Sequence, residues 1–371
     1  MEKIKPMRDL IVIGGGPAGT SAAITCARNG ARVLLLERGR FPRHKVCGEF
    51  VSAESLDLLA GLLAPQDKPL LADAIRIPRA RVFLDGRVLE TAVDPPAASI
   101  SRLNFDVALW ASAEQCGVEA RQQVVVRSIS GSGPFLVETS VGQFKSRALV
   151  NASGRWSNLN RTSVDGQNSG VKWLGLKGHF AEPSPSASVD LYFFQGGYCG
   201  VQPVNIIDGA EQSARVNACA MVCTDVASTL SEVFICHPAL RERSRQWKPL
   251  SDPVSTSPLV FREPQPERDG ILMAGDAAAF VDPFVGDGIS LALRSGSLAA
   301  ESLLPFFAGD VSPAEAARNY VSAYERRLAP VFRMSSKIRR MLSLPQIIRT
   351  PILALLEKSP AIAHYLVSRT R

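Results

Sequence analysis

The sequence predicts an α/β fold: a parallel sheet assembled from separate chain segments, an inserted antiparallel β-sheet and a helical C-terminus. Three observations predict it. A complete strand–helix–strand unit occupies the first forty residues, a strand-rich segment follows, and a late strand ends in Gly-Asp at 275–276 before a long helix. Strands that alternate with helices are typical of a parallel sheet covered by helices.

The first unit is recognisable from its pattern alone. The apolar run 9–13 is long enough for a buried parallel strand. An alanine-rich stretch predicts a helix over 17–28, and Asn29-Gly30 supplies a glycine suited to the helix exit. A second apolar run, 31–36, predicts the next strand.

The turn between the first strand and the helix matches GxGxxG at Gly14, Gly16 and Gly19, and Glu37 closes the second strand. Gly14 makes the tight turn, Gly16 lets the backbone approach a pyrophosphate, and Gly19 lets the helix pack closely. The helix N-terminus offers N–H groups to phosphates. Glu37 can accept hydrogen bonds from a ribose, and its charge disfavours a 2′-phosphate. The pattern indicates FAD or NAD; a glycine-rich turn of another α/β protein is the alternative.

Composition describes an ordinary globular protein of 371 residues, 46% hydrophobic and 21% charged, long enough for two domains. The N-terminus has no signal-peptide pattern, and no run approaches eighteen apolar residues. Seven cysteines, odd in number and scattered, indicate free thiols. We therefore expect a cytoplasmic protein.

The net charge of +7 is concentrated at the end of the chain. From Val331 onward there are eight Lys and Arg against the single Glu357, which amounts to the whole excess. Such a tail is either a solvated helical face or a peripheral contact with an anionic membrane. We expect no nucleic-acid partner.

The middle of the chain predicts several further elements. A helix is expected over 52–63, and short strand-like pieces over 80–84 and 88–91 lie among prolines. Ser101 caps a helix that runs to Cys116. Strands are expected over 118–150, where the last ends in Asn-Ala-Ser-Gly, and over 172–224, with turns at 196–197 and 208–209.

The C-terminal third predicts a strand at 270–276, a loop at 281–288 and a helix over 289–303. Ser312 begins another helix with a capping box. Pro351 and Pro360 are each expected to start a short helix.

With these segments in order, the chain resembles the FAD-dependent oxidoreductases that include aromatic hydroxylases, flavin halogenases and geranylgeranyl reductases. The resemblance is strongest over 9–49 and 270–297, and PRHKVCG at 42–48 is similar to the PRxKxCG segment of the geranylgeranyl-reductase branch. It implies an FAD-binding Rossmann-type (glutathione-reductase-like) domain, a substrate domain and a helical C-terminus. The implied boundaries are 1–62, 98–170 and 262–312 for the first, 63–97 and 171–261 for the second, and 313–371 for the third.

The resemblance also implies a set of site residues. Asp276 would accept hydrogen bonds from ribityl hydroxyls, and the loop before the 289–303 helix would bring N–H groups to the flavin ring. The candidate catalytic residues are Cys47, His44 and Tyr198; packing roles are the alternatives for Cys47 and Tyr198. No metal ligand is expected. The cofactor-binding candidates are Gly14, Gly16, Pro17, Ala18, Gly19, Glu37, Arg38, Arg43, Lys45, Cys47, Gly48, Arg102, Gly154, Gly275, Asp276, Pro283, Gly286, Asp287, Gly288 and Ile289.

The implied function is an FAD-dependent oxidoreductase that reduces a carbon–carbon double bond of a hydrophobic substrate, with NADPH or NADH as a transient electron donor. A monooxygenase is one alternative, and a non-catalytic carrier with this fold is another. Halogenation is disfavoured, because the segment 197–203 lacks the WxWxIP pattern and Asp287 would repel a halide. Segment 197–203 also departs from the geranylgeranyl-reductase pattern, and Ser153-Gly154 departs from the Asp-Gly of aromatic hydroxylases.

Overall fold

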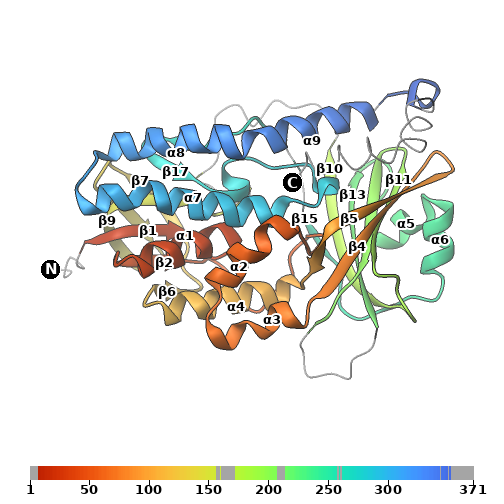
Figure 1. Ribbon diagram of the computed structural model, residues 1–371, viewed down its shortest axis with the longest axis horizontal. Helices are drawn as coiled ribbons and strands as arrows, with labels where there is room; N and C mark the ends of the chain where they lie inside the picture. The colour runs from red at the N-terminus through yellow and green to blue at the C-terminus, as the bar shows by residue number, and fades with distance from the viewer. Residues whose placement is uncertain are drawn as a thin grey trace.

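A computed structural model describes residues 7–155, 159, 172–206, 214–256, 259, 261–342, 344–349 and 351. Two β-sheets lie side by side along the long axis of the molecule, and helices cover both (Figure 1). The α/β prediction, with parallel and antiparallel sheets and a helical C-terminal part, is confirmed.

The first sheet carries the predicted strand–helix–strand unit. Along the main path its strands pair in the order β16-β17-β9-β1-β2-β6, all in parallel except β16 with β17. Two further strands of the same sheet, β8 (Phe135–Thr139) and β7 (Val126–Ser130), continue from β9 as antiparallel neighbours. They come from three separate stretches of the chain, as the resemblance implied, whereas the domain boundaries themselves stay a prediction. The strands are β1 (Arg8–Ile13), β2 (Val33–Leu36), β6 (Glu119–Arg121), β9 (Gly142–Asn151), β16 (Glu267–Arg268) and β17 (Ile271–Met273).

The two faces of this sheet bury different partners, because alternate side chains of a strand point to opposite faces. Leu10 and Val12 of β1 belong to a core shared with the helices α1 (Pro17–Arg28), α4 (Arg102–Gln115) and α7 (Gly288–Ala308). Ile11 and Ile13 pack on the other face, against β7 (Val126–Ser130) and β8 (Phe135–Thr139). Both faces of the strand are buried, which is why its sequence is continuously apolar.

The second sheet is larger and mostly antiparallel, in the order β14-β10-β13-β12-β11-β4-β5-β3, with β15 paired to β10. Only β11 and β4 pair in parallel among these described strands. The expected turn at 196–197 joins β11 to β12, whereas the one at 208–209 lies outside the described residues. The strands are β3 (Phe50–Val51), β4 (Ile75–Leu84), β5 (Arg87–Ser99), β10 (Trp173–Ala181), β11 (Ser188–Phe194), β12 (Gly197–Pro203), β13 (Arg215–Cys223), β14 (Lys248–Pro249) and β15 (Val254–Thr256).

The prediction of two short strand pieces at 80–84 and 88–91 was wrong about their extent. β4 and β5 form one long hairpin that turns at Asp85 and Gly86, both with positive φ (51° and 75°). Pro78 falls where the register shifts between Ile77 and Arg79. A proline at a bulge removes no ladder hydrogen bond, so it does not end the strand.

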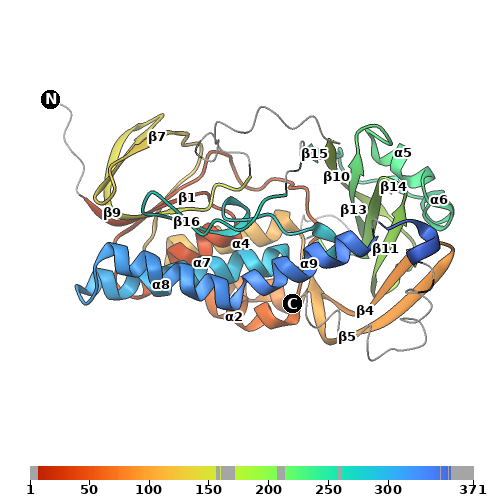
Figure 2. The same ribbon diagram turned by 90° about the horizontal axis from the view of Figure 1, so that it is seen from above.

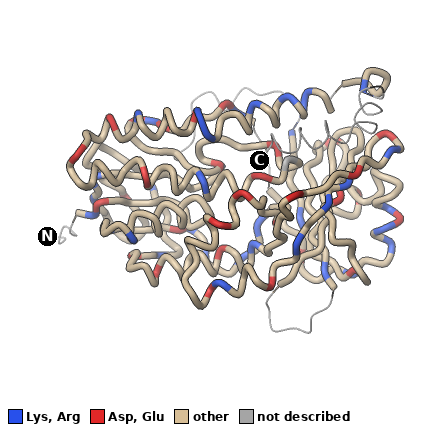
Figure 3. Tube along the Cα trace, in the orientation of Figure 1, with Lys and Arg blue, Asp and Glu red and all other residues tan. Residues whose placement is uncertain are grey.

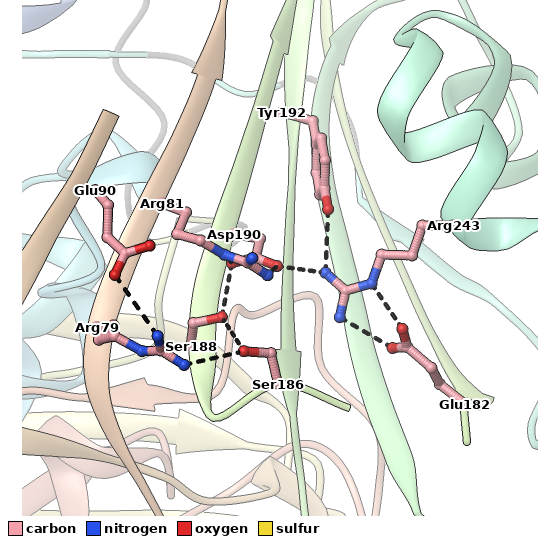
Figure 4. A network of polar contacts seen from close by, with 9 residues as sticks. All are labelled: Arg79, Arg81, Glu90, Glu182, Ser186, Ser188, Asp190, Tyr192 and Arg243. Atoms are coloured by element: carbon pink, nitrogen blue, oxygen red, sulfur yellow. Dashed lines mark hydrogen bonds and ion pairs between the residues drawn. The ribbon is translucent and has the colours of Figure 1, made fainter. Parts of the chain in front are cut away.

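The helices α5 (Leu230–Ile235) and α6 (Pro238–Ser244) cover one face of the second sheet, and a network of charges connects α6 to it (Figure 4). Arg243 of α6 donates to Glu182 at 2.8 Å and to Asp190 at 2.6 Å. Arg81 of β4 donates to the other oxygen of Asp190 at 2.7 Å. The carboxylate of Asp190 is fully buried, and these two arginines compensate its charge.

The C-terminal helices α8 (Pro313–Arg327) and α9 (Ala329–Leu342) follow one another from the first sheet to the second (Figures 1 and 2). Ser312 caps α8 by accepting from Glu315 N–H at 3.2 Å, which is the N-cap half of the expected capping box. The helices expected at Pro351 and Pro360 lie almost wholly outside the described residues. No helix in the described part of the chain has the length and apolar character needed to cross a membrane. The shorter helices are α2 (Leu56–Leu62) and α3 (Pro69–Ala72), with 3-10 turns at Ala53–Ser55, Pro65–Asp67, Gly275–Ala277 and Pro283–Val285.

Candidate functional site

A cavity of about 470 Å³ lies where the two sheets meet. One end is lined by the turn that leaves β1, at the carboxyl edge of the parallel sheet, where ligands of open α/β sheets bind. The other end is lined by β12, β13 and β15 of the second sheet. The volume is in the range of small-molecule and cofactor sites.

The glycine turn has the geometry that its sequence predicts. Gly14 has φ of 105°, and a Cβ there would lie 2.3 Å from the carbonyl oxygen of Ala152. A Cβ on Gly19 would lie 1.8 Å from the oxygen of Gly14, so this glycine allows α1 to pack against the turn. Gly16 differs, because a Cβ there would have no atom closer than Arg102 Nη2 at 3.9 Å. The turn is therefore open toward the cavity at this residue.

Glu37 is buried at the end of β2 and organises the loop that follows. Its carboxylate accepts from Gly15 N–H at 2.8 Å, from Gly39 N–H at 2.7 Å and from Arg43 Nη2 at 2.7 Å. Burial alone would raise the pKa of Glu37, but Arg43, Lys45 and the two N–H groups hold it below its ordinary value. Glu37 is therefore a permanent negative charge at the cavity wall.

The late segment reaches the same cavity. Gly275 (φ 60°) begins the turn after β17, and Asp276 pairs with Arg155, with Nε to Oδ2 at 3.4 Å. Gly286 (φ 77°) ends the next turn, and α7 starts at Gly288. These residues bring a carboxylate and a helix N-terminus to the same cavity as the first glycine turn.

Every predicted site residue lines this cavity except Gly19 and Asp287. Gly19 lies behind the turn, in the packing described above. Asp287 is 1% exposed and accepts from Ser52 Oγ at 2.7 Å. Burial raises the pKa of Asp287 to about 6.

Cys47 lines the cavity and is held there by two neighbours. Its sulfur accepts from Glu49 N–H at 3.3 Å and is hydrogen-bonded to the Arg102 side chain. Arg102 is itself buried and makes a bidentate pair with Asp106, at 2.8 and 2.9 Å. Burial opposes the charge of Arg102, yet Asp106 and Cys47 raise its pKa above the ordinary value.

The residues of the far end were missed by sequence reasoning. Tyr198 was proposed alone, but the structure adds Met221, Leu259 and Phe280, which give an apolar lining. Tyr198 lies opposite Met221 in the ladder between β12 and β13. The sequence signal for this lining is the alternation of side chains between the two faces of β12 and β13. That alternation does not reveal which face of the sheet meets the cavity.

The wall suits a flavin dinucleotide on chemical grounds. An open glycine turn at a helix N-terminus can bind a pyrophosphate, and the buried Glu37 carboxylate can accept from a ribose. At the other side Asp276 offers a second carboxylate, and the N-terminus of α7 offers N–H groups and a positive dipole end.

Comparison with known proteins agrees with this geometry. Residues 9–42 match the family model described as FAD dependent oxidoreductase. This match and the sequence relatives fit the FAD-dependent oxidoreductase superfamily. Digeranylgeranylglycerophospholipid reductase 2 of Methanopyrus kandleri is 27% identical over 355 residues, covering 90% of this chain and 86% of that protein, which supports the geranylgeranyl-reductase-like branch.

Two solved structures share the fold. A flavin-dependent brominase superposes with a TM-score of 0.77 at 22% identity, covering 98% of this chain and 93% of that one. A geranylgeranyl bacteriochlorophyll reductase-like protein from Thermoplasma acidophilum gives 0.74 at 18% identity, covering 98% and 95%. At these identities the two structures show a shared fold. The sequence relatives are enzymes and include both reductases and halogenases, so this chain is an enzyme of the same broad type.

Proposed function

We propose that this protein reduces a carbon–carbon double bond of a hydrophobic small molecule by flavin-dependent hydride transfer. The observation that carries the proposal is the continuity of the cavity. It runs from the glycine turn and Glu37 to an apolar end lined by Met221, Leu259 and Phe280. A hydrophobic substrate in that end would lie in the same cavity as the cofactor, as hydride transfer requires.

The cofactor contacts can be assigned by chemistry. The turn at Gly14–Gly16 and the N-terminus of α1 would bind the pyrophosphate, and Glu37 the adenosine ribose. Asp276 would bind the ribityl chain, and the backbone at 283–289 would face the ring system. When bound, FAD supplies two-electron chemistry, taking electrons from a donor and passing them on as a hydride. We propose NADPH or NADH as that transient donor.

Cys47 would supply the proton that completes the reduction. Donation leaves a thiolate, and the Glu49 N–H and the Arg102 guanidinium both donate to this sulfur and would stabilise it. Burial, followed by the charges of Lys177 and His179, lowers the pKa of His44, so this imidazole is neutral at pH 7. Burial keeps the Tyr198 phenol protonated by raising its pKa, which suits a wall residue.

A monooxygenase is the second candidate, because proteins that share this fold include a flavin-dependent brominase. Mass spectrometry of products separates the two reactions. A reductase adds two hydrogens to the substrate, whereas a monooxygenase incorporates one oxygen from ¹⁸O-labelled O₂. Products that gain labelled oxygen and never two hydrogens would overturn the proposed reduction.

The basic C-terminal region would rest on an anionic membrane surface where such a substrate resides. Lys and Arg recur along α9 (Figure 3), and beyond it Ile347 and Ile348 are 84% and 49% exposed. An ion pair between Arg349 and Asp85, at 2.6 Å, fixes the segment that carries Ile347 and Ile348 to the β4–β5 hairpin. Exposed apolar side chains beside basic ones are typical of interfacial segments.

Vesicle co-sedimentation tests this contact. Ile347→Glu with Ile348→Glu should weaken binding to vesicles that contain anionic lipid, because charge opposes insertion of the turn. Ile235→Glu, on the exposed side of α5, is the matched control. Equal recovery of all three proteins with anionic and with neutral vesicles would contradict a membrane role.

A further inference from the structure

A cluster of buried charges lies directly behind the cavity wall. Glu49, Lys177 and His179 are 0%, 1% and 1% exposed. The Glu49 carboxylate accepts from Lys177 Nζ on one oxygen, and its other oxygen lies 2.8 Å from His179 Nε2. The first oxygen also accepts from the backbone N–H of Arg102, at 2.7 Å.

The carboxylate of Glu49 is ionised. Burial alone would raise its pKa, but Lys177 and His179 lower the pKa of Glu49 to about 2. An ionised carboxylate can only accept, so His179 Nε2 carries the proton and donates to it. Placing ions in a protein interior contributes little stability, because desolvation offsets their attraction.

Glu49 also has a backbone conformation that costs energy. Its φ is 61°, in the left-handed region that residues with a Cβ rarely adopt. This conformation aims the N–H of Glu49 at the sulfur of Cys47 and its side chain at β10. A strained, fully buried, charged residue is better explained by a role at the site than by stability.

The second sheet contacts the wall at two further points, one through His179 of the cluster and one through Asn217 beside it. The His44 ring, which lines the cavity, makes an edge contact with the His179 ring at 5.3 Å between centroids. On β13, Asn217 Nδ2 donates to the carbonyl oxygen of Cys47 at 3.0 Å. His44 and Cys47 are therefore both fixed to the second sheet.

Charged and titratable groups reach this wall from every element packed on it. Lys177 and His179 belong to β10, Cys219 to β13, and the Arg102–Asp106 pair to α4. Cys219 accepts from the N–H of Cys47, and burial raises its pKa to about 12, so it is a neutral thiol. The loop itself contributes Arg43, Lys45 and Glu49.

We propose that Glu49, Lys177 and His179 form a positioning site that holds His44 and Cys47 in the cavity wall and sets their reactivity through its charges. The use of these two residues in catalysis rests on the proposed function, but the electrostatic effect does not. Lys177 and Glu49 act with opposite sign, since a nearby cation favours a thiolate and disfavours an imidazolium, and an anion does the reverse.

The opposite signs expected for Lys177 and Glu49 distinguish an effect of charge from an effect of a loosened loop. Lys177→Met removes the cation and should raise the titration midpoint of His44 by at least about 0.5 pH unit. It should also slow alkylation of Cys47 by iodoacetamide at least about threefold at pH 7. Glu49→Gln removes the anion and should shift both quantities the other way. A loosened loop would move both variants in the same direction.

The experiment uses full-length protein loaded with FAD and labelled on histidine, followed by NMR from pH 5 to pH 8. The chain has four histidines, so His44→Asn assigns the signal. Alkylation at Cys47 is read by peptide mass spectrometry. Lys177→Arg and Glu49→Asp keep the charges and should leave His44 unchanged, while Lys172→Met, an exposed lysine just before β10, is the control for charge removal.

Shifts of opposite sign in Lys177→Met and Glu49→Gln, with both charge-conserving variants near wild type, support the proposal. Shifts of the same sign, or none, overturn it. Should Glu49→Gln not fold, Lys177→Met compared with Lys177→Arg still decides, because only the first removes the charge. Neither readout needs a substrate, so a failure of the proposed reaction in the product assay would be recognised separately.

Discussion

Asp282 offers a sharp test of the electrostatics inferred for the flavin side of the site. It is 3% exposed, and one oxygen accepts from Phe284 N–H at 3.4 Å. Its Oδ2 lies 4.0 Å from Arg339 Nε and has no hydrogen-bond partner in the described part of the chain. Burial raises the pKa of Asp282 from 3.8 to about 7, against the weaker opposing effects of Phe284 and Arg339.

The sign of the pH dependence follows from linkage. The unfolded chain loses this proton near pH 4, whereas the folded protein keeps it until about pH 7, so stability falls as pH rises between these values. The slope is about 1.4 kcal/mol per pH unit, and the full cost above pH 7 is about 4 kcal/mol. Below pH 4 both states are protonated and the cost disappears.

Asp282→Asn removes the ionisation and keeps an oxygen that can accept from Phe284 N–H. The free energy of unfolding of Asp282→Asn relative to wild type should therefore grow by roughly 3 kcal/mol between pH 5 and pH 8. Urea unfolding followed by circular dichroism at four pH values measures it. Asp310→Asn, on the surface after α7, is the control. A difference between Asp282→Asn and wild type that is equal at pH 5 and pH 8 would refute the reasoning.

Three further outcomes are expected. Gly19→Ala should abolish FAD retention after gel filtration, because its Cβ would lie 1.8 Å from Gly14 O, whereas Gly61→Ala, with nothing within 4 Å, should keep the flavin. Arg243→Met should lower the free energy of unfolding by more than about 1 kcal/mol in urea titrations, since it removes the partner of half-buried Glu182 and leaves buried Asp190 with Arg81 alone; a smaller loss would contradict this. Ser312→Ala should lower the free energy of unfolding by about 1 kcal/mol in the same titrations, because α8 loses its cap. An unchanged free energy of unfolding would show that the cap does not stabilise the protein.

The parts of the fold that the sequence predicts well are those whose signals are local. The strand, the glycine turn, α1 and Glu37 are contiguous, so a single window contains the whole pattern. The same holds for the turn at Gly275 and the start of α7. The hairpin of β4 and β5 was underestimated because Pro78 reads as a strand breaker, and nothing local indicates that a bulge accommodates it.

The buried charge cluster could not be predicted for the opposite reason. Lys177 and His179 are two residues apart and share a face of β10, but a lysine and a histidine in a strand are usually exposed. Their partner Glu49 lies 128 and 130 residues earlier in the chain. Only the tertiary structure brings a carboxylate to them. Without that carboxylate, burial of the lysine and the histidine would be unfavourable, so the sequence alone does not predict it.

The loop between the two sheets unites these observations, because a buried carboxylate fixes each of its ends. Glu37 binds the N–H of Gly39 and the side chain of Arg43, which attaches the start of the loop to the first sheet. Glu49 binds Lys177 and His179, which attaches its end to the second sheet. The wall residues between them, Cys47 included, are therefore positioned by both sheets at once. A contact that a nucleotide makes with Glu37 would also act on the loop that carries Cys47, so binding at the cofactor end can organise the wall that faces the substrate.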